Sequence, residues 1–272
     1  MVRQARYGGL PHRLAALAIP CLAGLTYLAV SGAPGNYVIV NAAALGIALG
    51  WIVVGRVATS VIARRGVSIA LLAAFAAPLV IGPDVEGVAR WLTVGGFALH
   101  AGMLALPLLV VLAASDRPAG VFFLLAAVAV AFIQPDAASA LALGLGALAA
   151  GWQTRHWKMG AAGVLGVLAS VAASFGGELP PQPFVEGILP GPSSTSPLLA
   201  IALSGSLCIA AVLIACNPGI GCAPRFALIG ALAGFVLAAI FGNYPTPLVG
   251  YGAASIFGMG LALARSRRPL VA

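Results

Sequence analysis

The chain has 272 residues, of which 61% are hydrophobic and only 7% are charged. A soluble globular domain carries about 25% charged residues, so this composition excludes a water-soluble surface. The polar residues gather in short clusters between apolar runs of helical length. This pattern predicts an all-α, polytopic integral membrane protein whose surface faces mostly lipid.

The basic balance of the chain, a formal net charge of +8, is compatible in principle with nucleic-acid binding. Such a protein gathers its basic residues on one exposed face. Here they fall at the ends of alternate apolar segments, which is typical of membrane topology, so no nucleic-acid partner is expected. The four cysteines lie in or at the ends of apolar segments and the three histidines are scattered. The sequence therefore predicts no metal site and no cofactor.

Breaking the chain at Pro, Gly and charge clusters predicts about ten spans in a single transmembrane domain, residues 1–272. One apolar stretch, residues 118–152, is divided at Gln134-Pro135-Asp136, because proline and a carboxylate both disfavour the interior of a membrane helix. The predicted spans are residues 14–32, 37–55, 66–82, 96–114, 118–133, 137–152, 158–175, 197–215, 225–242 and 247–264.

With ten spans, 13 of the 14 Lys and Arg residues fall on one side and only Arg90 falls on the other. The positive-inside rule makes the basic side cytoplasmic. Both chain ends are then cytoplasmic. Five of the six acidic residues lie on the outer side: Asp84, Glu86, Asp136, Glu178 and Glu186.

Two outer loops, about 82–96 and 175–196, are long enough to form a working surface. In the first, Arg90 precedes Trp91. This pair suits either a snorkelling anchor at the membrane interface or recognition of a phosphate on a lipid head group. Asp136 suits either an N-cap of the helix that follows it or a buried partnership with Arg90. For His100, near the start of a span, we expect an interhelical hydrogen bond.

Three segments resemble the SEDS family (shape, elongation, division and sporulation proteins). GVARWLTVGGF, residues 87–97, is similar to the family's GARRW-L-LGGF stretch, and IQPDAASALALGLGALAAGW, residues 133–152, is similar to its QPDLGTA segment and the helix after it. GNYPTPLVGYGAASI, residues 242–256, is similar to its late PLPFxSYGGSS segment. The resemblance spans nearly the whole chain. It implies ten spans with cytoplasmic ends, a large outer loop between helices seven and eight, and a location in the bacterial inner membrane.

By this resemblance, the chain is expected to act in peptidoglycan synthesis, where family members polymerise undecaprenyl-linked lipid II with a class B penicillin-binding protein. Two departures bear on that activity. Ser196 stands where the family carries an essential Asp, and a hydroxyl with no adjacent base cannot replace that carboxylate. Met103 and Leu106 stand where the family carries a Glu and a Lys. Glu186 and Glu178 are the weak candidates for a substitute catalytic carboxylate.

The leading hypothesis is a divergent, short SEDS-like protein of cell-wall synthesis, cell division or cell shape, which binds a lipid-linked precursor or a partner with its polymerase chemistry weakened or lost. Arg90, Trp91, Asp136 and Tyr251 are the expected substrate-binding residues. Pro245, Pro247 and Gly252 are expected to shape the outer start of the last helix. The alternatives are an active lipid II polymerase and a structural subunit of a membrane complex, and a transporter ranks below them because few ionisable groups lie within the spans.

Overall fold

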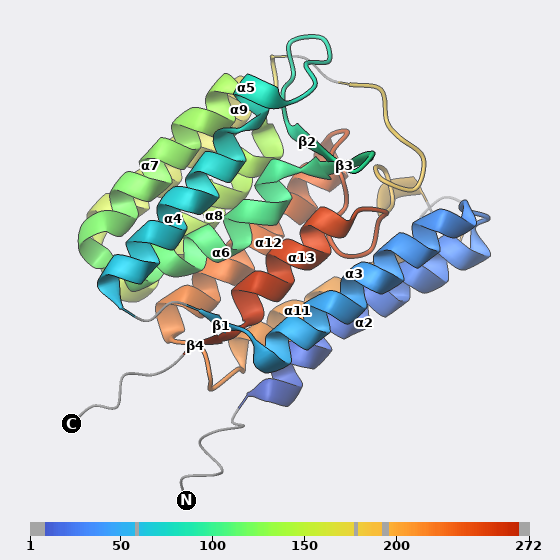
Figure 1. Cartoon of the computed structure of the whole chain (residues 1–272), viewed down its shortest axis with the longest axis horizontal. Helices are drawn as coiled ribbons and strands as arrows, with labels where there is room; N and C mark the ends of the chain where they lie inside the picture. Colours follow the sequence, from blue (N-terminus) through green and yellow to red (C-terminus); the bar gives the residue numbers. More distant parts are fainter. Residues whose placement is uncertain (1–8, 58–59, 177–178, 192–195, 267–272) are drawn as a thin grey trace, which may run out of the picture.

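The computed structural model describes residues 9–57, 60–176, 179–191 and 196–266 and shows a bundle of helices (Figure 1). Ten of the helices in these ranges have 11 residues or more. They are α2 (Leu10–Val30), α3 (Gly35–Val54), α4 (Val61–Ala76), α6 (Ala101–Ser115), α7 (Arg117–Ile133), α8 (Ala137–Thr154), α9 (Trp157–Ala173), α11 (Pro197–Ala215), α12 (Cys222–Phe241) and α13 (Ala253–Leu263). The prediction of an all-α polytopic fold is confirmed.

Short elements complete the fold. The helix α5 (Pro78–Ile81) continues α4 after a break at Ala77. The strands β2 (Trp91–Val94) and β3 (Phe97–His100) form an antiparallel hairpin in which Trp91 is opposite His100. The strands β1 (Arg56–Val57) and β4 (Arg265–Ser266) pair in parallel and join the ends of α3 and α13.

Two predicted spans begin before their helices do. Residues 96–100 were expected to be helical, but they belong to the β2–β3 hairpin, because Gly95 and Gly96 adopt positive φ angles of 57° and 83° and reverse the chain. The last span was expected from residue 247, but α13 begins at Ala253. Two features keep residues 247–252 out of the helix: Leu248 has a φ of 67° and Gly252 a φ of 154°.

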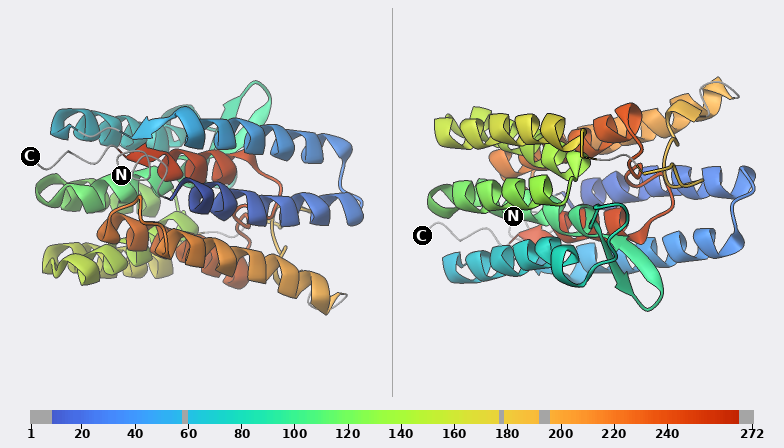
Figure 2. Two further views of the ribbon diagram at one scale, coloured as in Figure 1. Left: turned by 90° about the horizontal axis from the view of Figure 1, so that it is seen from below. Right: turned by 90° about the horizontal axis from the view of Figure 1, so that it is seen from above.

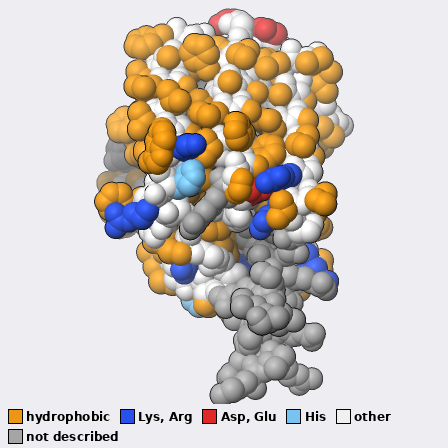
Figure 3. All heavy atoms as spheres, turned by 90° about the vertical axis from the view of Figure 1, so that its left-hand side faces the viewer, with side chains coloured by type: hydrophobic (Ala, Val, Ile, Leu, Met, Phe, Trp, Pro, Cys, Tyr) orange, Lys and Arg blue, Asp and Glu red, His pale blue; other side chains and the backbone are white. Residues whose placement is uncertain are grey.

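The outside of the bundle is apolar along the helices. Five helical segments are long and apolar enough to cross a membrane: 10–30, 35–54, 61–81, 197–215 and 222–241. Large side chains such as Ile62, Val80 and Phe241 are exposed on their surfaces. Figure 3 shows hydrophobic side chains over the upper part of one face, with Lys, Arg and His side chains below them. This surface is that of a multi-pass membrane protein.

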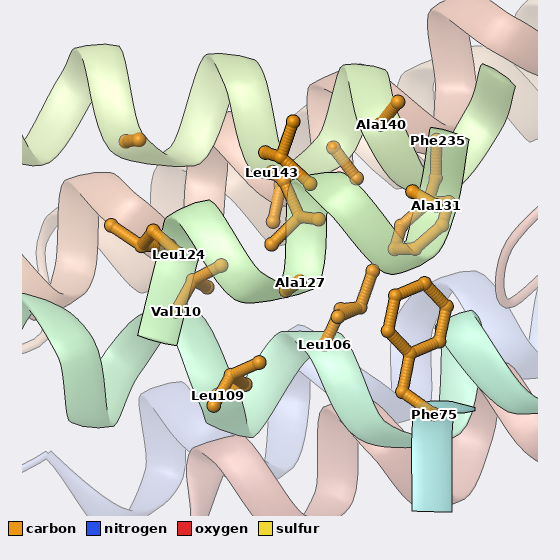
Figure 4. Packing of buried hydrophobic residues seen from close by; sticks show 14 of the residues in the cluster. Phe75, Leu106, Leu109, Val110, Leu124, Ala127, Ala131, Ala140, Leu143 and Phe235 are labelled. Atoms are coloured by element: carbon orange, nitrogen blue, oxygen red, sulfur yellow. The ribbon is translucent and has the colours of Figure 1, made fainter. Parts of the chain in front are cut away.

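The centre of the bundle is formed by α6 and α8, and most residues of both helices are buried. Larger side chains such as Phe75, Leu106 and Leu143 fill the space between the helices (Figure 4). Elsewhere the helices approach through small residues: a Cβ atom added at Gly234 of α12 would lie 2.5 Å from the Cα atom of Ala142 on α8. Close packing through small residues is typical of membrane helices.

The long helices run side by side in both views of Figure 2, so the bundle has two ends. These two ends differ in charge. We call one end the basic end: it comprises the start of α2, the β1–β4 pair and the α6–α7, α8–α9 and α11–α12 turns. Among the described residues, Asp116 is the acidic residue of this end, and it forms an ion pair with Arg65 at 2.9 Å. We call the opposite end, with residues 82–100, 134–136, 179–191 and 242–252, the acidic end.

Candidate functional site

A cavity of about 940 Å³ lies at the acidic end. Its walls come from α3, from residues 83–100, from the loop 179–186 and from residues 243–257. Much of the wall is apolar, and its rim includes Val94 and Phe97 of the hairpin, which are 58% and 49% exposed. Arg90, Trp91, Glu186 and Tyr251 line the same cavity. The structure therefore brings four of the predicted site residues together.

Arg90 is the cation of this cavity, and it is only 3% exposed. Its Nη2 atom donates a hydrogen bond to the carbonyl oxygen of Pro135 at 2.6 Å, and its Cζ atom lies 4.8 Å from the centre of the Tyr244 ring. The buried Nε atom has no hydrogen-bond partner. A snorkelling side chain exposes its charged head to water, so the anchor alternative does not fit this geometry. The guanidinium keeps a donor available inside a cavity.

Asp136 is completely buried behind the cavity wall. Its Oδ1 atom accepts a hydrogen bond from the backbone N–H of Ser139 at 3.0 Å, as expected for the N-cap of α8. Within the described residues the predicted partnership with Arg90 is not an ion pair. The guanidinium instead contacts the carbonyl group one residue earlier, at Pro135. Asp136 thus fixes the start of α8 at the point where Arg90 is held.

His100 lies between the hairpin and α6, next to Asp136. Its Nδ1 atom accepts a hydrogen bond from the backbone N–H of Met103 at 3.3 Å and so caps α6. Its Nε2 atom lies 3.6 Å from the Oδ2 atom of Asp136. The expected interhelical hydrogen bond is therefore replaced by an N-cap and a longer contact with a buried carboxylate. A neutral imidazole that accepts at Nδ1 carries its proton on Nε2, on the side of Asp136.

Glu186 faces Arg90 from the loop 179–191 and lines the cavity. Its Oε2 atom accepts a hydrogen bond from the backbone N–H of Gln182 at 2.8 Å. Burial raises the pKa of the Glu186 carboxyl group, while this hydrogen bond and the charge of Arg90 oppose the increase. Glu178, the other candidate carboxylate, lies outside the described residues.

Aromatic side chains join the loops that surround the cavity. Tyr251 stacks on Tyr37 of α3, with ring centres 3.6 Å apart, and Phe184 meets Tyr37 edge to face. The backbone N–H of Tyr251 donates to the carbonyl oxygen of Phe184 at 2.7 Å. Trp91 is on the hairpin side, with its ring edge-on to His100. Tyr251 therefore holds together two loops that are distant in the sequence.

Asn41 is a site residue that the sequence analysis missed. This buried side chain of α3 donates to the carbonyl oxygen of Gly250 at 2.9 Å and accepts from the backbone N–H of Gly252 at 3.1 Å. Its two bonds attach α3 to the loop before α13 and so set one wall of the cavity. The signal that could have revealed it is a lone amide side chain in the apolar run VIVNAAALG.

Ser196 is at the N-cap position of α11, and its side chain makes no capping hydrogen bond. It is not among the described residues that line the cavity. The position where the resemblance expects a catalytic carboxylate therefore carries a hydroxyl group that is not part of the described cavity wall.

The three segments that resemble the SEDS family meet at this end of the bundle. Arg90 comes from the first segment, Asp136 from the second and Tyr244 from the third. The guanidinium of Arg90 contacts the other two segments directly, through Pro135 and Tyr244. A cavity with apolar walls and one buried cation is suited to a ligand that has an anionic head and an apolar body.

No sequence model of a protein family matches the chain, and no curated protein matches it in sequence. Solved structures do match in fold. The rod shape determining protein RodA of Thermus thermophilus is 18% identical, with a TM-score of 0.58 over 94% of each chain. An aspartate-to-alanine variant of the same protein matches with a TM-score of 0.61 over 94% of this chain and 95% of that one.

A third match is a chain of a peptidoglycan synthase complex that coordinates polymerization and crosslinking. It is 18% identical, with a TM-score of 0.52 over 94% of this chain and 96% of that one. The likeness extends over nearly the whole length of all three chains. The present chain therefore has the multi-pass membrane fold of RodA, a SEDS protein.

Proposed function

We propose that this chain is a SEDS-like protein of the bacterial inner membrane that acts in cell-wall synthesis, cell division or cell shape. It binds an undecaprenyl-linked precursor in the cavity at the acidic end and does not polymerise it. The acidic end faces outward and both chain ends are cytoplasmic, since the positive charge gathers at the opposite end. The RodA fold and the three converging segments support this assignment.

The observation that carries the proposal is the position of Arg90. It is a buried cation with an unpartnered Nε donor, in the wall of a cavity of about 940 Å³ whose rim includes the exposed apolar side chains of Val94 and Phe97. A guanidinium makes short, charge-assisted hydrogen bonds with phosphate oxygens. The pyrophosphate of the precursor would bind there while the polyprenyl chain follows the rim at Val94 and Phe97.

The carboxylates available at the site support a role without polymerisation. Ser196 cannot act as a general base, and it is not part of the described cavity wall. Glu186 does line the cavity, but its carboxylate already accepts a backbone hydrogen bond from its own loop. An active polymerase that uses Glu186 as its base is the alternative, favoured by the raised pKa of that group.

Binding and polymerisation can be measured separately with purified protein in nanodiscs and labelled lipid II. We expect wild type to bind lipid II and to form no glycan chain under conditions where RodA works. Arg90→Gln should weaken binding about tenfold, because it removes a charge-assisted hydrogen bond. Arg56→Gln, which removes a cation at the basic end, is the matched control and should bind like wild type.

Two further variants keep the test decisive. Because Arg90 also bonds to Pro135, Arg90→Gln could disturb folding. Val94→Asp on the exposed rim is therefore an independent test. Its negative charge should also weaken binding of the anionic precursor. Ser196→Asp tests whether a restored carboxylate gives glycan chains. Chains formed by wild type and abolished in Glu186→Gln would establish the polymerase alternative and overturn the proposal.

A class B penicillin-binding protein is the proposed partner, because one matching chain comes from a complex that coordinates polymerization and crosslinking. A structural subunit of another membrane complex is the competing assignment. Co-purification in mild detergent distinguishes the two, since the first predicts a stoichiometric penicillin-binding protein and the second predicts other subunits.

A further inference from the structure

The turn between α8 and α9 carries a cluster of aromatic and basic side chains at the basic end, far from the cavity. Its sequence is WQTRHWK, residues 152–158. We call Trp152, Arg155, Trp157 and Lys158 the α8–α9 patch. Both tryptophan side chains are strongly exposed, at 73% and 76%. The exposure of two large aromatic rings on one short turn indicates contact with something outside the chain.

Each tryptophan of the patch carries a cation over its ring. The Cζ atom of Arg155 lies 5.4 Å from the centre of the Trp152 ring, and the Nζ atom of Lys158 lies 5.8 Å from that of Trp157. Such contacts hold the charged groups in place without using their hydrogen-bond donors on a protein acceptor. The patch therefore presents two positioned cations beside two apolar surfaces.

Three other cations at this end are already bound by the protein. Arg13 donates to the carbonyl oxygen of Gly219, Arg65 to the carboxylate of Asp116, and Arg225 to the carbonyl oxygens of Ala215 and Asn217. In the ranges that the structure describes, neither Arg155 nor Lys158 donates a side-chain hydrogen bond to the protein. The donors of the patch are thus open to a ligand from outside.

The backbone of the α8–α9 turn is strained at Arg155. Arg155 has a φ of 54°, in the left-handed region that favours glycine at the end of a helix. The backbone N–H of His156 closes the turn on the carbonyl oxygen of Gly151. Glycine would suit this backbone conformation better than arginine does.

We propose that the α8–α9 patch is a binding site for the phosphate head group of an acidic phospholipid. The two cations contact the phosphate, and the two tryptophan rings lie at the level of the head groups, as in other membrane interfaces. The excess positive charge of the basic end favours an anionic over a zwitterionic lipid. This site is separate from the cavity of the proposed function and does not depend on it.

The test uses the whole chain in nanodiscs of phosphatidylcholine and phosphatidylglycerol. Two preparations are compared, in which either one lipid or the other carries brominated chains that quench tryptophan fluorescence. Trp51→Phe and Trp91→Phe in the background leave Trp152 and Trp157 as the only tryptophans. We expect stronger quenching by brominated phosphatidylglycerol than by brominated phosphatidylcholine. Arg155→Gln and Lys158→Gln should each reduce this preference about fivefold.

Two variants separate a built site from diffuse charge and from folding. Arg56→Gln removes an exposed cation of the same end that has no tryptophan beneath it, and it should leave the preference unchanged. Arg155→Gly should reduce the preference while raising the thermal unfolding temperature, since it relaxes the backbone. Equal quenching by both lipids, or an equal loss in Arg56→Gln, would overturn the proposal.

Discussion

The two ends of the bundle differ in the length of the connections between the helices. At the basic end the chain turns quickly: Asp116 alone lies between α6 and α7, and Arg155 and His156 alone join α8 to α9. At the acidic end, residues 82–100, 179–191 and 242–252 belong to long connections that surround a cavity of about 940 Å³. A tight turn cannot enclose a ligand, whereas long connections can.

Each end contains one buried asparagine that ties distant segments together. At the acidic end Asn41 joins α3 to Gly250 and Gly252. At the basic end Asn217 donates to the carbonyl oxygen of Gly9 and accepts from the backbone N–H of Gly219. An asparagine side chain that bonds to the backbone thus closes the basic end and shapes the cavity at the acidic end. Variants of Asn41 and Asn217 can therefore separate effects on stability from effects on ligand binding.

Both ends depend on the contact between α8 and α12, so the largest effect is expected there. In Gly234→Leu the new side chain meets the backbone of α8 at Ala142, and we expect a loss of roughly 3 kcal/mol or more of stability, or failure to fold. Thermal unfolding in detergent measures this. Gly205→Leu on α11, where a Cβ atom meets open space, is the matched control; equal damage from both would contradict the packing.

Asn41→Leu should cost about 3 kcal/mol of stability, because it leaves a buried carbonyl oxygen and a backbone N–H without partners. Asn217→Leu should destabilise by a similar amount. Only the first should weaken binding of lipid II in addition, which a titration under folding conditions would reveal. If both variants lost lipid II binding to a similar extent, the binding site would not depend specifically on the asparagine at the acidic end.

The pKa of Glu186 gives the cavity an expected pH dependence. Burial raises this pKa, so the carboxyl group is neutral at lower pH and becomes charged as the pH rises through its raised value. The new negative charge beside Arg90 should weaken binding of an anionic ligand about fivefold. Glu186→Gln should bind equally well across this pH range. A dependence that persists in this variant would assign it to another group.

The smallest effect is expected at the ion pair of the basic end. The guanidinium of Arg65 lowers the pKa of Asp116, so the pair contributes stability above the unfolded-state pKa and loses it as the pH falls through the lower folded-state value. Asp116→Asn should flatten the decrease of unfolding temperature between about pH 5 and pH 2. The change should be small because Arg65 is partly exposed, and lipid II binding should not change.

The helices and the difference in charge between the two ends of the bundle could be predicted, because apolar runs and the basic residues that flank them are recognisable from neighbouring residues in the sequence. The break at Gln134-Pro135-Asp136 was also predicted from neighbouring residues, a proline and a carboxylate. It is confirmed, since α7 ends at Ile133 and α8 begins at Ala137. The hairpin at residues 91–100 was missed, since its apolar residues read equally well as helix.

The candidate site was only partly predictable. Arg90, Trp91, Glu186 and Tyr251 were selected individually and do line one cavity. The burial of Arg90 could not be deduced, because it depends on Pro135 and Tyr244, which are distant in the sequence. The contact between His100 and Asp136 depends in the same way on how two helix ends meet.

The attachment of α3 has a mechanical consequence. It is bound to the α13 region at two points, through β1 and β4 beyond one end and through Asn41 near the other. These two attachments restrain α3 from moving away from the bundle. We therefore expect the proposed lipid ligand to enter past the hairpin, where Val94 and Phe97 are exposed at the rim of the cavity.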